Sequence, residues 1–318
     1  MAAEADLRVD VGGGLVIANP VIAASGTFGY GVEYAGVVDL RALGAVVVKG
    51  ISRRPSAGHP PPRLVETPAG MLNAIGLQNV GVERFVAEKL PWLRSRGVTV
   101  VVNCWGNTVE EYGEVVAALD TAPGIAALEV NISSPNKPEW GGIIATDAKR
   151  TAEVVAVARR ATRLPLWVKL SPNVSDITEV ARVAEDAGAD AVCVANTYIG
   201  MAVDLRRRQP VLSNVTGGLS GPAIKPLNLR AVYQVVRATK LPVIGIGGIS
   251  TGRDALEYLL VGAHAVQVGT ANLYDPGAGP KILRQIKKFL EAEGIARVHD
   301  FVGSLKSGRH VDRTPKLS

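Results

Sequence analysis

The sequence predicts a single (β/α)₈ barrel spanning residues 1–318, and three observations lead to that prediction. Eight short runs of apolar and β-branched residues are spread along the whole chain. Each run is apolar at nearly every position, which suits parallel strands covered by helices on both faces. Helix-like segments alternate with the runs, and eight strands favour a closed barrel. An open doubly wound sheet would need a G-x-G-x-x-G turn after the first strand, and ASGTFGYG does not match it.

The expected strands are the apolar runs themselves. They lie at residues 21–25, 45–50, 98–103, 126–133, 166–170, 191–196, 242–248 and 265–269. The expected helices are the Ala-, Val- and charge-rich stretches between them, at 147–161, 175–187, 226–239, 251–261 and 280–293. Ser175 is the predicted N-cap of its helix, because Thr178 and Glu179 would then occupy the first turn.

Two long stretches, 51–79 and 198–225, separate predicted elements and contain few helix signals. Long ordered loops in compact domains are usually functional, so we expect both to cap the mouth of the barrel. In the first, the sequence MLNAIGLQN predicts a hairpin or a cap over the site.

Composition predicts a folded core and argues against several classes of protein. Hydrophobic residues make up 47% of the chain and charged residues 20%, so disorder is not expected. The net charge of +6 favours anionic ligands. The sequence has no clustered stripe of arginine and aromatic residues, so nucleic-acid binding is not expected. The two cysteines, Cys104 and Cys193, lack CxxC or Cys/His spacing, so no metal or iron–sulfur site is expected in this chain.

The placement of the cysteines and the distribution of apolar residues predict a cytoplasmic protein. Both thiols lie in apolar runs, as suits a reducing compartment. The first ten residues lack the basic and apolar regions of a signal peptide, and no apolar run approaches the ~18 residues that a membrane span requires.

Polar residues stand where several predicted strands end. Lys49 follows AVVV, Asn103 follows VTVVV, and Lys169 lies in LWVKL. The segment 126–142, AALEVNISSPNKPEWGG, runs from a buried strand into a loop of Asn, Ser, Pro and Gly. Because the carboxyl ends of all strands meet at one rim of a barrel, we expect these side chains to share a site.

The last two strands end in glycine-rich sequences, GIGG and VGTAN. Gly247, Gly248, Gly269 and Thr270 lie there. Barrels often bind phosphate at this place through backbone N–H groups and a helix N-terminus, which predicts a phosphate-binding site. The alternative is that these glycines only permit tight turns.

Seven motifs in order resemble the dihydroorotate dehydrogenases. They are ASGTFG, MLNAIGLQN, VNISSPN, VKLSPN, TGGLSGPAIKP, GIGGI and VGTAN. The resemblance covers about residues 15–289 and points to the family 1 enzymes, particularly the 1B type that works with an electron-transfer subunit. It implies a (β/α)₈ barrel that binds one FMN per chain and oxidises (S)-dihydroorotate to orotate in pyrimidine synthesis.

The resemblance also implies a catalytic base. Family 1 enzymes usually carry Cys in NxSCPN, whereas this chain reads NISSPN, with Ser134 in that place. Serine is typical of the membrane-associated family 2 enzymes and of an uncommon family 1 variant. The expected roles are removal of a proton by Ser134 and transfer of a hydride to flavin N5. The alternative is that Ser134 caps a turn, as serine often does.

The resemblance gives the two strand-end lysines different roles. It implies that Lys49 contacts both flavin and substrate and takes part in catalysis, and that Lys169 lies near flavin N1 and O2. The alternative is that each lysine reaches the barrel mouth and pairs with a carboxylate such as Glu129.

The remaining site residues follow from the same resemblance. Amides donate and accept hydrogen bonds, so several of them can read the polar edge of orotate; alternatively, each Asn marks a turn. The residues expected to bind the substrate are Lys49, Asn73, Asn103, Asn131, Asn136, Asn196 and Thr197. The residues expected to bind the flavin are Ser25, Gly26, Lys49, Asn103, Asn131, Lys169 and Gly221, together with the phosphate-site residues named above.

The 1B type implies a partner subunit that carries FAD and a [2Fe-2S] cluster and passes electrons to NAD. A homodimer or a heterotetramer is expected, and fumarate or a quinone is the alternative acceptor. Two other functions stay open: a flavin barrel acting on dihydropyrimidines that lack the carboxylate, and a non-catalytic FMN-binding subunit.

Overall fold

A computed structural model of the chain describes residues 4–135 and 143–306. Within them, eight parallel strands close into a barrel in the order β10-β15-β16-β3-β4-β7-β8-β9. In chain order these strands are β3 (Val21–Ala23), β4 (Ala45–Ile51), β7 (Val100–Cys104), β8 (Ile125–Asn131), β9 (Leu166–Lys169), β10 (Ala191–Val194), β15 (Val243–Ile246) and β16 (Ala265–Val268). The predicted barrel is confirmed, and each strand lies within its apolar run or overlaps it closely.

The barrel strands are buried on both faces, as their apolar sequences predict. Every residue of β7, β9, β10, β15 and β16 is buried. One face of each strand packs inside the barrel and the other packs under the helices, so a polar side chain on either face must find a partner within the protein.

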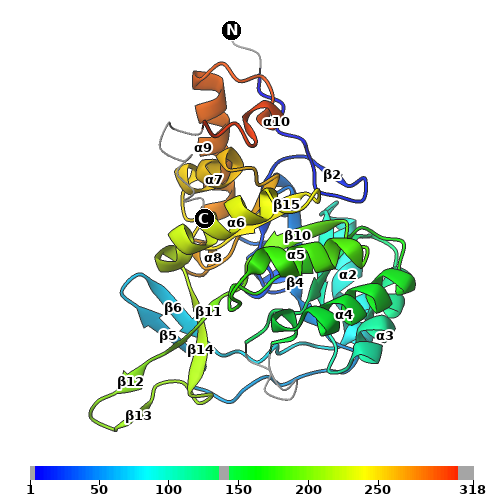
Figure 1. Cartoon of the computed structure of the whole chain (residues 1–318), viewed down its shortest axis with the longest axis vertical. Helices are drawn as coiled ribbons and strands as arrows, with labels where there is room; N and C mark the ends of the chain where they lie inside the picture. Colours follow the sequence, from blue (N-terminus) through cyan, green and yellow to red (C-terminus); the bar gives the residue numbers. More distant parts are fainter. Residues whose placement is uncertain (1–3, 136–142, 307–318) are drawn as a thin grey trace, which may run out of the picture.

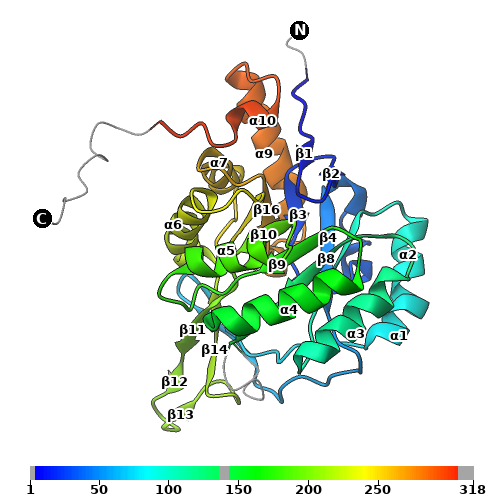
Figure 2. The ribbon, with the colours of Figure 1, turned by 45° about the vertical axis from the view of Figure 1, so that its right-hand side comes forward.

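Helices surround the barrel on all sides in Figures 1 and 2. They are α1 (Val82–Arg84), the π-helical segment η3 (Phe85–Lys89), α2 (Leu90–Ser95), α3 (Val109–Asp120), α4 (Ala148–Ala161), α5 (Ile177–Asp186), α6 (Lys225–Val236), α7 (Gly252–Leu260), α8 (Ala271–Tyr274), α9 (Ala278–Ala292) and α10 (Val298–Phe301), with 3₁₀ turns η1 (Val32–Tyr34), η2 (Leu40–Ala42), η5 (Ile144–Thr146) and η6 (Pro222–Ile224). In the part of the chain described, none of these helices has the length and apolarity to cross a bilayer.

All five predicted helices are present. Besides the short helices α8 and α10, the described residues contain two longer helical regions that the sequence pattern did not reveal. The first, α1 to α2, has Pro91 in the opening turn of α2, which breaks the helical pattern in the sequence. The second, α3, carries Gly113 in its interior. Its start signals are nevertheless clear, because Thr108 accepts a hydrogen bond from the backbone N–H of Glu111.

The predicted N-cap of α5 is wrong by one residue. Asp176, not Ser175, has the extended backbone of a cap, and its carboxylate accepts hydrogen bonds from the N–H and hydroxyl of Thr178 at 2.8 and 2.7 Å. A carboxylate at this place also suits the positive end of the helix dipole.

The cap of α5 gives a direct test of this assignment. Asp176→Ala should lower the free energy of unfolding by about 1 kcal/mol, because it leaves backbone donors of the first turn unsatisfied. Ser175→Ala, one residue earlier and equally exposed, is the matched control and should change it much less. Chemical denaturation of the three proteins measures the difference, and equal losses would reject the assignment.

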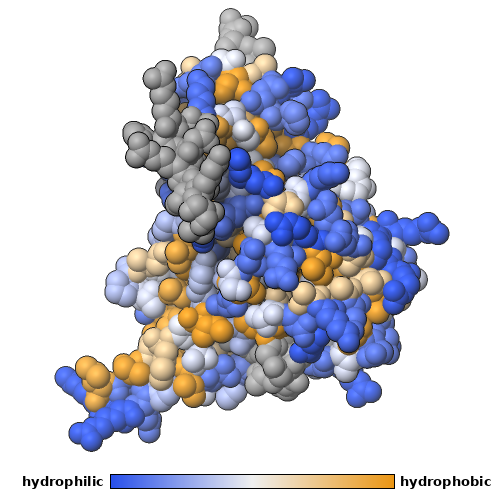
Figure 3. All heavy atoms as spheres, viewed as in Figure 1, coloured by the Kyte–Doolittle hydropathy of each residue, from blue (hydrophilic) through white to orange (hydrophobic). Residues whose placement is uncertain are grey.

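A second, antiparallel sheet lies at one end of the barrel. This cap sheet has the order β11-β14-β6-β5, and β12 and β13 extend it as an arm that projects from the body of the molecule (Figures 1 and 2). Its strands are β5 (Leu64–Thr67), β6 (Gly70–Asn73), β11 (Tyr198–Met201), β12 (Val203–Asp204), β13 (Gln209–Pro210) and β14 (Thr216–Ser220). Figure 3 shows apolar side chains gathered over the sheet and arm, where Ile199, Met201 and Leu205 are exposed.

The opposite end of the barrel carries an N-terminal hairpin. Strands β1 (Val9–Asp10) and β2 (Val16–Ile17) pair antiparallel. Gly12 and Gly13 in their turn lie directly against Asp190 and Pro165, the residues that precede β10 and β9. The hairpin therefore packs against the amino ends of β9 and β10, at the end of the barrel opposite the cap sheet.

Candidate active site

A cavity of about 250 Å³ lies between the carboxyl ends of the barrel strands and the cap sheet. Nearly all of the predicted site residues line it, although they come from widely separated segments. These residues are Ser25, Gly26, Lys49, Asn73, Asn131, Ser134, Lys169, Asn196, Thr197, Gly221, Gly247, Gly248, Gly269 and Thr270.

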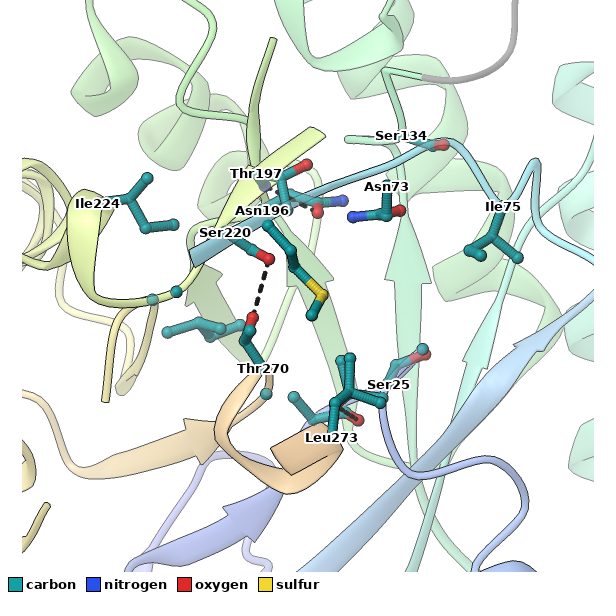
Figure 4. Close-up of a pocket in the computed structure, with 18 of the residues that line it drawn as sticks. Ser25, Asn73, Ile75, Ser134, Asn196, Thr197, Ser220, Ile224, Thr270 and Leu273 are labelled. Carbon is teal, nitrogen blue, oxygen red and sulfur yellow. Dashed lines mark hydrogen bonds between the residues drawn. The ribbon is translucent and has the colours of Figure 1, made fainter. Parts of the chain in front are cut away.

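The cavity has two sides that differ in character (Figure 4). In this view Asn73, Asn196 and Thr197 lie close together, with Ser134 beside them, whereas Ser25, Leu273 and Thr270 lie on the opposite side. The amide of Asn73 donates to the carbonyl of Gly218 at 3.2 Å, which fixes this side chain to the neighbouring strand of the cap sheet. The cap sheet and the strand ends therefore each supply part of one amide-rich wall.

One predicted residue in the described part of the chain does not line the cavity. Asn103 is completely buried one layer below it, inside the barrel. Asn136 lies outside the described residues.

A chain of hydrogen bonds runs from the amide-rich wall into the barrel. Asn196 Nδ2 donates to Ser133 Oγ at 2.9 Å, and Ser133 Oγ donates to Asn131 Oδ1 at 3.1 Å. Asn131 Nδ2 then donates to Asn103 Oδ1 at 3.2 Å, and Asn103 Nδ2 donates to Glu129 Oε1 at 2.6 Å. The wall is therefore connected, through side chains alone, to a carboxylate in the barrel interior.

Lys169 lines the cavity and is buried against the same carboxylate. Its ammonium lies 3.5 Å from Glu129 Oε1, and both side chains are almost completely inaccessible. The pairing with Glu129 that was the alternative to a ligand role therefore exists, but it lies inside the barrel rather than at a solvated mouth. The same lysine contacts the cavity and its counter-ion at once.

Lys49 is placed differently, half-buried at the end of β4. Burial, and after it the nearby charge of Arg63, lowers the pKa of the Lys49 amine below its ordinary value, although Glu33 acts in the opposite direction. A partly desolvated ammonium beside a cavity interacts strongly with an anionic ligand, because little solvent screens it.

The glycine-rich ends of β15 and β16 form the other part of the lining. Gly247 and Gly248 both adopt positive φ angles, 121° and 67°. A side chain on Gly248 would meet the backbone nitrogen of Lys225, in the first turn of α6, at 2.8 Å. The backbone here thus lies against the start of a helix, the arrangement that suits a phosphate group. Beside it, Thr270 Oγ1 donates to Ser220 Oγ at 2.8 Å, a bond drawn in Figure 4.

Comparison with known proteins decides which family carries this site. The sequence profile described as dihydroorotate dehydrogenase matches residues 7–293. The chain belongs to the dihydroorotate dehydrogenase family. The resemblance that the seven motifs suggested is therefore confirmed at the level of the family.

Individual relatives of the family match over nearly their full lengths. The catalytic subunit of dihydroorotate dehydrogenase B (NAD⁺) from Geotalea uraniireducens is 56% identical over 300 residues, which cover 94% of this chain and 98% of the relative. The protein of the same name from Geotalea daltonii is 54% identical over 304 residues, 96% of this chain and 99% of the relative. The protein of the same name from Geobacter sulfurreducens is 55% identical over 301 residues, which cover 95% of this chain and 98% of the relative.

Motif reasoning missed several residues that support the site in this family member. Ser133 links two wall amides, and Gln267 in β16 donates to Glu129 Oε2 at 2.5 Å. A sequence signal existed for both Gln267 and Glu129, because Gln267 is the one polar residue of β16, and Glu129 interrupts the apolar run of β8 two residues before Asn131. Ser133 could have been found by counting two residues on from Asn131, since alternate residues of an extended chain share a face.

Proposed function

We propose that this chain is the catalytic subunit of an NAD-linked dihydroorotate dehydrogenase, which oxidises (S)-dihydroorotate to orotate with bound FMN in pyrimidine synthesis. The observation that carries the proposal is the cavity itself, where amides, Ser134 and two lysines meet under the cap sheet. The relatives named dihydroorotate dehydrogenase B (NAD⁺), catalytic subunit, support the same conclusion.

The cavity fits FMN in three respects. Lys49 and Lys169 supply positive charge to the cavity, which suits a flavin that becomes anionic on reduction. Glycine backbone at the start of α6 suits the phosphate. A side chain added at Gly26 would meet nothing within 4 Å, so the backbone there faces open space for a ring. The residues that would hold the cofactor include Ser25, Gly26, Lys169 and the glycine-rich ends of β15 and β16.

FMN, when bound, supplies a hydride acceptor at its N5 atom, and the chain supplies the remaining functions. Lys169 places a positive charge against the cavity. Asn73, Asn131 and Asn196 can donate and accept along the imide edge of dihydroorotate, and Lys49 can bind its carboxylate. The cap sheet, built within segments 51–79 and 198–225, covers the substrate and excludes water.

Ser134 is the proposed base for the proton that leaves the substrate ring. It is 5% exposed, lines the cavity, and lies on the same side as Asn73 in Figure 4. A serine hydroxyl is a weak base until a neighbour removes its own proton. The hydroxyl of Thr197, which lines the same cavity, is the proposed route for that proton.

The first test concerns FMN. The purified chain should bind about one FMN per barrel, detected by flavin absorbance and fluorescence. Gly269→Val should weaken FMN binding at least tenfold with little loss of stability, because a Cβ at Gly269 meets only ordinary contacts beyond 3.6 Å while the side chain grows into the cavity. Gly248→Val should lower both FMN affinity and the stability of the fold, because its side chain would clash with the start of α6. A folded Gly269→Val protein that binds FMN as wild type does would contradict this cofactor site.

The second test concerns Ser134. Ser134→Ala should slow flavin reduction by dihydroorotate at least ~10²-fold, the usual scale for a lost general base, while orotate binding changes little. The wild-type rate should rise with pH, because an alcohol loses its proton only at high pH. Ser134→Cys should stay active and extend activity to lower pH, because thiols ionise more readily.

Stopped-flow flavin bleaching across pH measures these rates for the three proteins. If Ser134→Ala is reduced as fast as wild type, Ser134 is a turn residue and the proton leaves elsewhere. Dihydrouracil, which lacks the carboxylate, is the control substrate; efficient reduction by it would favour a broader dihydropyrimidine activity.

The third test concerns the electron acceptor. The chain should pass electrons to NAD only with a partner subunit that carries FAD and a [2Fe-2S] cluster, in a heterotetramer. Isolated FMN-loaded chain should therefore reduce NAD very slowly, and adding the partner should restore the rate. Rapid reduction of NAD, fumarate or a quinone by the isolated chain would contradict the partner route.

A further inference from the structure

Glu129 is a carboxylate enclosed in the interior of the barrel. It lies on β8 and is 0% exposed. Three donors converge on it: Asn103 Nδ2 at 2.6 Å, Gln267 Nε2 at 2.5 Å and Lys169 Nζ at 3.5 Å. Since all three donate, an ionised carboxylate, which only accepts, is the form that satisfies them. Glu129 does not line the cavity, so no ligand contact accounts for it.

The first consequence is that Glu129 sets the direction of the hydrogen-bond chain at its inner end, at Asn103. Because a carboxylate cannot donate, the nitrogen of Asn103 must face it, which turns Asn103 Oδ1 toward Asn131. That oxygen requires the nitrogen of Asn131, so Asn131 Oδ1 turns toward Ser133.

Backbone N–H groups hold the two outer amides in the same direction, and Asn196 Oδ1 accepts from the N–H of Thr197 at 2.8 Å. Asn131 Oδ1 accepts from both the hydroxyl and the backbone N–H of Ser133, at 3.1 and 3.2 Å. The Ser133 oxygen then accepts from Asn196 Nδ2 at 2.9 Å. An amide whose orientation is fixed presents the same donors and acceptors to every ligand, whereas one that is free to flip does not.

The second consequence concerns charge. Lys169 is the one member of this cluster that both contacts Glu129 and lines the cavity. Two opposite charges at this distance in a poorly solvated interior interact strongly. Glu129 therefore reduces the positive field that Lys169 exerts on whatever occupies the cavity.

Stability alone is a weak explanation for the pair. Burying a carboxylate and an ammonium costs several kcal/mol of solvation, and well-packed apolar side chains often serve stability as well or better. An effect on the adjoining cavity explains why the charges are placed here, at the end of β8 and β9 that carries the site.

We propose that Glu129 is a positioning residue of the active site. It fixes the orientation of the Asn103 amide, which accepts from Asn131 at the cavity wall, and it offsets Lys169 so that the bound flavin keeps a lower reduction potential. This inference rests on the proposed function, because it takes FMN and orotate as the occupants of the cavity.

The test uses the full chain loaded with FMN, and it measures the flavin midpoint potential and the dissociation constant of orotate. Glu129→Gln should raise the potential by about 30 mV or more, which corresponds to a tenfold shift of a two-electron equilibrium. It should also weaken orotate binding at least tenfold, because glutamine can donate to Asn103, turn its amide and remove the acceptor of Asn131 Nδ2.

Two further variants distinguish the effects of the Glu129 charge and of its acceptor role from a general effect of substitution. Glu129→Asp keeps an acceptor-only anion, and it should restore the potential to near the wild-type value and recover part of the orotate affinity. Glu185→Gln is the matched control. Glu185 accepts from Thr239 Oγ1 and Lys240 N at 2.6 and 3.1 Å near the opposite end of the barrel, and its loss should change neither measurement.

If Glu129→Gln does not fold, the comparison is made in a background that lacks Lys169. Lys169→Gln and the double variant Lys169→Gln with Glu129→Gln are compared, and removal of Glu129 should again raise the potential by a tenfold shift or more. An unchanged potential in both backgrounds, or unchanged orotate affinity in Glu129→Gln, overturns the inference and leaves the proposed function intact. A wild-type chain that binds neither FMN nor orotate overturns both.

Discussion

The closure of eight parallel strands is the constraint on which the rest of this structure depends. Because every barrel strand points the same way, all eight carboxyl ends meet at one rim. Residues as distant in sequence as Ser25 and Thr270 therefore line one cavity. At the other rim the hairpin of β1 and β2 packs against the starts of β9 and β10, so the polar strand ends and the cavity lie at the opposite rim.

Much of this arrangement could be predicted from the sequence, because burial on both faces makes parallel strands conspicuous. Strand ends are also conspicuous, since a lysine or asparagine after four apolar residues has few structural explanations. Helices were harder to predict. Gly113 within α3 and Pro91 at the start of α2 weaken the helical pattern, although packing against the barrel holds both segments helical.

What could not be predicted is pairing across long stretches of sequence. The cap sheet joins β6 to β14, and Asn73 owes its position to the carbonyl of Gly218, 145 residues away. No local pattern encodes that register. Short-range competition is equally hard to resolve, as Ser175 and Asp176 show: both residue types cap helices, and only the backbone conformation at Asp176 decides between them.

Lys49 and Lys169 lie at the same rim of the barrel, but their surroundings change how strongly each ammonium attracts an anion in the cavity. Lys169 has a carboxylate 3.5 Å away inside the barrel, so part of its field is cancelled before it reaches the cavity. Lys49 lies at the edge, where burial and Arg63 both disfavour its charged form. A ligand anion near Lys49 would relieve that penalty, because it replaces the lost solvation with a direct ion pair. The strongest attraction for an anion is therefore expected at Lys49, and the steadier, compensated charge at Lys169. Under the proposed function, this division would place substrate recognition and cofactor tuning on two separate strands of the same barrel.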